Sequence, residues 1–258
     1  MTESEWLACA DPREMLEALQ AGGLLPERKA RLFAAACCRR IWHLLRDGRS
    51  RRAVEVGELL ADGLVTEAEA DAAGEAAAEA ADAVEGRPYE VLWRAATAAE
   101  YLLPRPGEWE LLHTVWEYVA TALEGERLVA EGATPEVLSS WSEQSVESGR
   151  TLGWTATNPD AVLADVLREV VGPVPFRPLL PVKPAWLTWH GGTVRRLAEG
   201  AYEERELPAG ALDLGRLAVL ADALEEAGCA DADLPGHLRG PGPHIRGCWA
   251  VDLVLGKQ

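Results

Sequence analysis

The sequence lacks any run of about 18 apolar residues, the length that a membrane-spanning helix needs. Its opening residues, MTESEWLACADPRE, lack the basic region and the apolar stretch of a secretory signal. Cysteine is scarce and odd in number, with five in 258 residues, and Cys37 and Cys38 are adjacent. These absences predict reduced thiols and a cytoplasmic protein that does not cross a membrane.

Alternating apolar patterns and hairpin turns are also absent, which argues against β-strands. No repeat of about 33 to 45 residues is visible, so a regular solenoid is not expected. The sequence has ten Trp but only two Phe and four Tyr. The large indole rings of Trp suit gaps between alanine-rich helices. The sequence therefore predicts an all-α fold, an irregular multi-helix bundle of roughly eight to eleven helices.

Basic residues are unevenly distributed along the chain. Residues 1–52 hold ten Lys or Arg against seven Asp or Glu, whereas residues 53–171 hold six against twenty-four. Residues 172–258 are close to balanced, with nine against eleven. An acidic body of this kind makes nucleic acid an unlikely partner, because phosphate affinity comes largely from Lys and Arg.

The chain divides into three predicted parts. Residues 1–171 form an acidic helical body that begins with a basic helix, PERKARLFAAACCRRIWHLLRDG. Residues 172–186 hold five prolines in fifteen residues and predict an extended arm or a domain boundary, because proline breaks helices. Residues 187–258 predict a small helical subdomain that shares one core with residues 1–60.

Four blocks of the sequence carry a resemblance: WLACADPREMLEAL, RKARLFAAACCRRIWHLL, PAWLTWHGGTVRRLA and LADALEEAGC with HLRGPGPHIRGCWAVDLVLGK. Together they resemble a paralogous family of planctomycete bacteria that carries no assigned activity. The resemblance covers residues 5–60 and 176–257. It implies that the N- and C-terminal blocks pack together, and it implies no mechanism.

The last forty residues hold the candidate metal ligands Cys229, His237, His244 and Cys248. Four soft or borderline ligands within twenty residues are enough for a tetrahedral zinc site, although no CxxC pair is present. Alternatively, both cysteines are small buried apolar residues and both histidines serve in turns or caps. The rigid PGPHIRG segment either presents His244 or simply connects two helices.

The basic N-terminal region offers two further candidates. Cys37 and Cys38, beside arginines and His43, could be reactive thiols with a lowered pKa, or two packed core residues. A set of arginines could contact the acidic body, a second copy of the chain or an anionic partner: Arg28, Arg39, Arg40, Arg51 and Arg52.

Motifs of the Ser-His-Asp, HExxH and GxSxG kinds are absent, so the sequence leans away from an enzyme. Many amphipathic helices and segregated charge favour a protein that acts by contact with another protein or with itself. A zinc- or thiol-dependent site protein is the alternative. A third hypothesis, an acidic mimic of nucleic acid, rests only on the charge of residues 53–171.

Overall fold

The computed structural model describes residues 1–84, 90–103, 114–134, 137, 159–173, 176–177 and 181–257. These residues form helices joined by turns. Within them there are two isolated β-bridges, Glu206 with Ala211 and Ala211 with Ile245, and no β-strand. The all-α prediction is confirmed.

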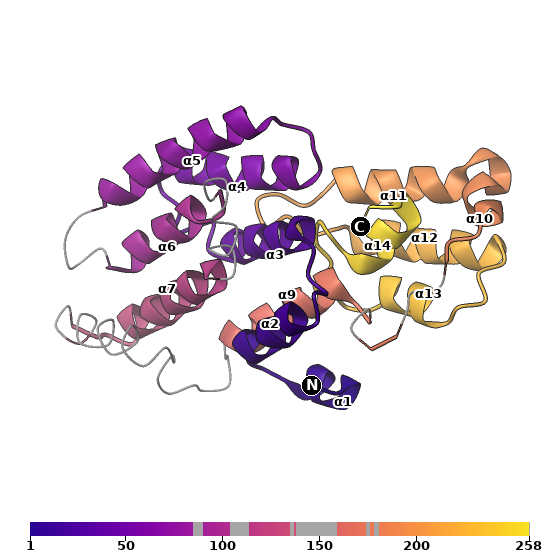
Figure 1. The fold of residues 1–258 in the computed structure, drawn as a ribbon, viewed down its shortest axis with the longest axis horizontal. Helices are drawn as coiled ribbons and strands as arrows, with labels where there is room; N and C mark the ends of the chain where they lie inside the picture. The colour runs from indigo at the N-terminus through magenta and orange to yellow at the C-terminus, as the bar shows by residue number, and fades with distance from the viewer. Residues whose placement is uncertain are drawn as a thin grey trace.

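The N-terminal part of the chain forms the left and lower centre of Figure 1, where α4 and α5 lie above α6 and α7 and α3 runs between the layers. Its helices are α1 (Glu3–Ala8), α2 (Pro12–Ala21), α3 (Glu27–Arg40), α4 (Gly48–Ala61), α5 (Glu67–Asp82), α6 (Glu90–Glu100), α7 (Val115–Ala130) and α9 (Pro159–Val171).

The C-terminal part lies to the right, with α14 facing the N-terminal helices (Figure 1). Its elements are α10 (Pro184–Thr188), the short 3-10 helix η3 (Trp189–Gly191), α11 (Thr193–Glu203), α12 (Leu214–Glu226), α13 (Asp233–Leu238) and α14 (Trp249–Leu255).

Local signals set several helix starts. Asp11 accepts a hydrogen bond from the Arg13 backbone N–H at 2.8 Å, and Pro12 takes the first helical position of α2, where its missing N–H costs nothing. Thr66 and Glu69 cap the first turn of α5 reciprocally. Both signals lie within one helix turn of the sequence.

The described residues hold thirteen α-helices, more than the eight to eleven expected. Several are only five to seven residues long, such as α1, α10 and α13, and so short a helix has almost no periodic pattern to detect. The predicted basic helix, in contrast, is shorter than expected. It ends at Arg40, and a tight turn then buries Ile41 and Leu45.

Within the described residues, the predicted arm at 172–186 also ends earlier than expected, because α10 begins at Pro184. Pro184 is the first residue of α10, a position that proline tolerates. Residues 174–175 and 178–180 lie outside the described residues.

Apolar side chains gather in two main clusters. One joins α1, α2, α3, α6, α7 and α9, with Phe33, Leu102 and Leu167 at its centre. The other lies within residues 186–254, with Tyr202 and Leu217 fully buried. The C-terminal helices thus bury an apolar core largely of their own. Apolar residues such as Ile245, which belongs to the first cluster, and a set of polar groups join them to the N-terminal helices.

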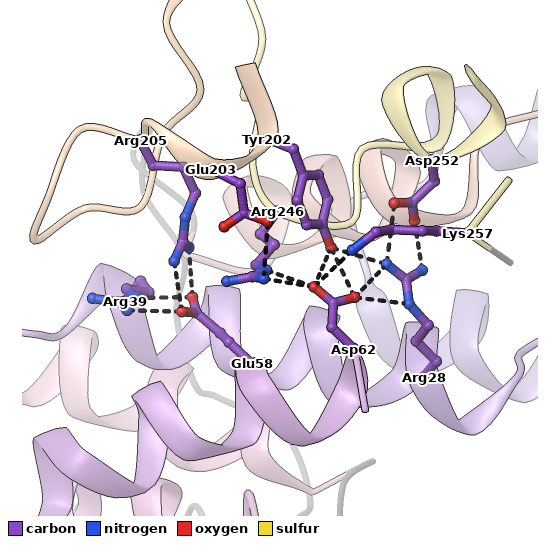
Figure 2. A network of polar contacts seen from close by, with 10 residues as sticks. All are labelled: Arg28, Arg39, Glu58, Asp62, Tyr202, Glu203, Arg205, Arg246, Asp252 and Lys257. Carbon is purple, nitrogen blue, oxygen red and sulfur yellow. Dashed lines mark hydrogen bonds and ion pairs between the residues drawn. The ribbon is translucent and has the colours of Figure 1, made fainter. Parts of the chain in front are cut away.

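Asp62, directly after α4, is the centre of that polar junction (Figure 2). Its side chain is 1% exposed and accepts hydrogen bonds from Arg28, Arg246 and the Tyr202 hydroxyl at 2.6–3.2 Å. Burial alone would raise the pKa of Asp62. The charge of Arg246, together with hydrogen bonds from Arg28, Tyr202 and Arg246 to the carboxylate, outweighs burial and lowers the pKa of Asp62 to about 2.

Two more carboxylates extend the junction. Asp252 on α14 accepts from Arg28 at 2.7 Å and from Lys29 at 2.6 Å. Glu58 on α4 lies between Arg39 and Arg205, each of which donates to it with two nitrogens. The N- and C-terminal blocks therefore pack together, as expected, through ion pairs that are shielded from water.

Candidate metal centre

Four side chains that can bind a metal meet on the other side of this junction. Glu169 comes from α9, His237 from α13, His244 from the following loop, and Cys248 from the residue before α14. One ligand atom from each lies within 4.8 Å of all the others. The glutamate belongs to the N-terminal helices and the other three to the C-terminal part, so the cluster spans both.

His244 faces Glu169 with a nitrogen that has no proton in the neutral ring. Its Nε2 lies 3.1 Å from the Gly240 carbonyl oxygen, which only accepts, so Nε2 carries the proton. Its Nδ1 then presents a lone pair to Glu169 Oε1 at 3.1 Å. Two acceptors at that distance need a proton or a cation between them.

One possibility is a proton on His244 Nδ1, which would then donate to Glu169 Oε1. Burial disfavours the charged ring, but the hydrogen bond to Glu169 and its charge raise the pKa of His244. The alternative is a metal ion. Metal-binding histidines commonly donate their second N–H to a backbone carbonyl, which is the contact that His244 makes with Gly240.

His237 points one nitrogen at two partners. Its Nε2 lies 3.2 Å from Glu169 Oε2 and 3.4 Å from Cys248 Sγ. In a Cys–His–carboxylate triad, the thiol and the carboxylate bind opposite nitrogens of the imidazole ring. Here both face the same nitrogen, Nε2, so this arrangement is not a catalytic triad. Nitrogen, oxygen and sulfur instead converge on one point, as ligands around a metal do.

Burial makes the charged forms of these side chains electrostatically unfavourable. The Glu169 side chain is 3% exposed, and burial would raise its pKa, yet hydrogen bonds from His237 and His244 lower it to about 2. Burial and the charge of Glu169 raise the pKa of Cys248 well above its usual value. Without a cation the thiol stays protonated, whereas a bound divalent ion favours the thiolate.

The structure brings together three of the four predicted ligands and leaves one out. Cys229 is absent from the group; its thiol donates to the Asp231 carbonyl at 3.9 Å and packs in the C-terminal apolar cluster. It lies in the short connection between α12 and α13, whereas His237 on α13 and His244 in the following loop both reach Glu169 of α9.

Glu169 is the fourth member of the group, and it was not among the ligands predicted from the sequence. The only available signal is a carboxylate within the strongly apolar helix PDAVLADVLREVV, where Val166 and Val170 are both fully buried. A buried Glu is almost always paired. In a chain with 42 acidic residues, that signal does not stand out.

The other predicted thiols are buried in the core. Cys37 and Cys38 are both 0% exposed, and burial raises the pKa of each. His43 points away from them and binds the Glu126 carboxylate at 2.9 Å. This environment favours packing over thiol chemistry.

The candidate interaction arginines have several environments. Arg28 and Arg39 pair with carboxylates of the same chain, as described above. Arg51 stacks on the Trp42 ring at 5.6 Å, and Arg52 lies 3.4 Å from Glu55. Arg40 is exposed on α3. Contact of these side chains with a partner stays a prediction.

A pocket of about 420 Å³ opens beside the cluster. Glu169 and His237 line it, as do Trp6, Phe176 and Trp249. Gly172 is required at its edge: it has φ +67, and a Cβ there would lie 2.4 Å from Trp249 Cγ. The pocket gives the metal ligands one accessible side.

Comparison with protein-family models, with curated proteins and with solved structures finds no match for this chain. The resemblance to a planctomycete family stays a prediction. Among the described residues, no helix is both long and apolar enough to span a membrane.

Proposed function

We propose that this protein binds one divalent transition metal ion, with zinc the first candidate, through Glu169, His237, His244 and Cys248. The observation that carries the proposal is the convergence of one oxygen, two nitrogens and one sulfur from four separate segments. Zinc accepts such mixed ligands in a tetrahedral arrangement.

The distances support a tetrahedral ion. Zinc bonds of about 2.0–2.3 Å place the ligand atoms of a tetrahedron about 3.3–3.7 Å apart. Three contacts within the cluster are 3.1, 3.2 and 3.4 Å, the first two to different oxygens of Glu169, so a metal requires only small outward movements there. A separation as wide as 4.8 Å would have to shorten by about 1 Å.

The charges support a divalent ion. A carboxylate and a thiolate together carry two negative charges, which one Zn²⁺ balances, and the two imidazoles are neutral. Burying a neutral cluster costs far less than burying the Glu169 carboxylate with incomplete compensation. A bound ion would also join α9 to the C-terminal helices, so its role includes fixing the two parts of the chain together.

Metal content tests the proposal directly. We expect elemental mass spectrometry of the purified full chain, without an affinity tag, to find about one zinc per chain. Cobalt(II) in its place should give a thiolate charge-transfer band, because Cys248 is a ligand. Cys248→Ser should abolish that band and lower metal affinity at least about 100-fold.

Cys229→Ser is the matched control, because Cys229 is also a buried C-terminal cysteine but lies outside the cluster. It should retain full metal content and the charge-transfer band. A wild-type protein that takes up no stoichiometric metal, or a Cys229→Ser variant that loses it while Cys248→Ser does not, would contradict the proposal. Action through protein–protein contact remains a separate hypothesis from the sequence.

A further inference from the structure

We propose that the pocket beside Glu169 and His237 binds an uncharged, flat molecule with a heteroaromatic nitrogen, and that this nitrogen coordinates the metal. The inference rests on the proposed metal site and adds the class of ligand that the site receives. It follows from the access to the cluster, the walls of the pocket and its charge balance.

Access to the cluster is one-sided. Glu169 and His237 line both the pocket and the metal cluster, whereas His244 and Cys248 do not line the pocket. The side chain of His237 is 23% exposed, against 1% for His244. A molecule that enters the pocket therefore reaches the metal from the side of Glu169 and His237.

The walls suit a flat apolar body. Trp6 and Phe176 lie with ring centroids 5.8 Å apart, and Trp249 lies against His237 at 4.9 Å. Pro173 and Pro243 complete the apolar lining. A volume of about 420 Å³ falls in the range of small-molecule sites and accommodates one or two fused rings. Aromatic rings gain from offset or edge contacts with such walls.

Both arginines in the described lining are already engaged. Arg168 donates to Asp165 at 2.7 Å and to the backbone carbonyls of Trp6 and Cys9. Arg177 pairs with Glu3 and Asp233. An anionic ligand would lose its hydration and find no free arginine among the described lining residues. A protonated nitrogen has no lone pair for a metal, so an uncharged ligand fits best.

The donor atom follows from the metal. Two imidazoles and a thiolate make a borderline-to-soft site, and such sites take nitrogen readily. The carboxylate of Glu169 is the hardest of the four ligands and lies on the pocket wall. An entering nitrogen therefore takes its position: the Glu169–metal bond breaks as the nitrogen–metal bond forms, and the carboxylate stays beside the ion as its counter-charge. A ring nitrogen within a flat molecule satisfies both the metal and the aromatic walls.

Cobalt(II)-loaded full-length protein tests this inference with three probes: 4-phenylimidazole, imidazole and phenylacetate. At about pH 8 the imidazole rings are uncharged. We expect 4-phenylimidazole to shift the visible ligand-field bands with a Kd at least about tenfold below that of imidazole, because its phenyl ring is buried between the walls. Phenylacetate, which is charged and has no nitrogen, should leave the bands unchanged.

A surface variant separates the pocket from the metal. Leu7 lines the pocket yet is 66% exposed, so Leu7→Asp should weaken 4-phenylimidazole about fivefold or more and leave cobalt affinity unchanged. Leu64→Asp is the matched control, since Leu64 is 60% exposed and is not among the residues that line the pocket. It should change neither quantity.

The outcomes separate the two proposals. Protein that shows the thiolate charge-transfer band but no response to 4-phenylimidazole overturns the ligand and leaves the metal site standing. Equal affinity for 4-phenylimidazole and imidazole, or tighter binding of phenylacetate, overturns the uncharged aromatic pocket. Protein that shows no charge-transfer band at all overturns the metal site and the ligand together.

Discussion

At the residue scale, the cysteines show how one side-chain type takes different roles in one chain. Cys248 meets two imidazoles and a carboxylate, Cys229 packs against apolar neighbours, and Cys37 and Cys38 are fully enclosed. Cys9 is the most exposed and donates to the Asp11 carbonyl at 3.3 Å. Reactivity should follow exposure, because a reagent must reach the thiolate.

We therefore expect one fast-reacting thiol in the native protein. Burial raises the pKa of Cys9 too, so its reaction should be slower than that of a free thiol at neutral pH, although faster than that of the other four, and should accelerate as the pH rises. The other four should react only on unfolding. Timed alkylation read by mass spectrometry checks this, and Cys9→Ser should remove the fast phase. A fast phase that persists in Cys9→Ser would show that another thiol is accessible.

At the element scale, the end of α9 positions Glu169 and forms an edge of the pocket. Gly172 follows the helix with a left-handed conformation, and the Trp249 ring lies where a side chain at this position would begin. Any side chain there meets both backbone strain and a steric clash. The contact holds α9 against the start of α14, so a single glycine links the two parts of the chain.

Gly172→Ala should lower the free energy of unfolding by about 2–4 kcal/mol, since strain and displacement of Trp249 add. Gly132→Ala is a matched control: Gly132 follows α7 with φ +87, but a Cβ added there would have no neighbour within 4 Å. It should cost only about 1 kcal/mol. Urea unfolding measures both. Similar losses for the two variants would mean that contact with Trp249 contributes nothing.

At the scale of the whole molecule, two apolar clusters are joined by a polar junction (Figures 1 and 2). Asp62 forms ion pairs with Arg28, Arg246 and Lys257 and accepts a hydrogen bond from the Tyr202 hydroxyl, and its carboxylate is almost fully buried. Among the described residues, removing that charge leaves the buried Arg246 with only the more distant Glu203 carboxylate, at 3.8 Å, and takes one of two carboxylates from Arg28. That loss costs more than the net contribution of the intact pairs. The junction therefore fixes how the two parts sit together.

Asp62→Asn should lower the free energy of unfolding at pH 7 by about 3–5 kcal/mol. The folded pKa of Asp62 is about 2, below its unfolded value, so its contribution is present above pH ~4 and is lost as the pH falls towards 2. The difference between wild type and variant should shrink over that window.

Asp82→Asn serves as the control, because Asp82 is an exposed residue at the end of α5. It should change stability by no more than about 0.5 kcal/mol. Denaturant unfolding from about pH 7 down to about pH 2.5 measures both variants. A constant difference between wild type and Asp62→Asn across that range would show that the Asp62 carboxylate has no pH-dependent role.

The sequence by itself determined the helical class, most longer helices and three of the four cluster residues. The caps at Asp11 and Thr66, and the apolar periodicity of α11, α12 and α14, act between residues a few positions apart. Such local patterns are readable because each helix turn brings near neighbours together. Short helices such as α10 and α13 could not be predicted, because proline-rich and five- or six-residue segments carry little periodicity.

Only the tertiary structure decided which residues meet across long distances. Glu169 reaches His244 over 75 residues, and Arg28 reaches Asp252 over 224. One of many acidic residues, Glu169, joins the cluster because α9 packs on the loop before α14, while Cys229 stays in the C-terminal apolar cluster. Contacts of that kind depend on how buried faces fit together, and no spacing in the chain encodes them.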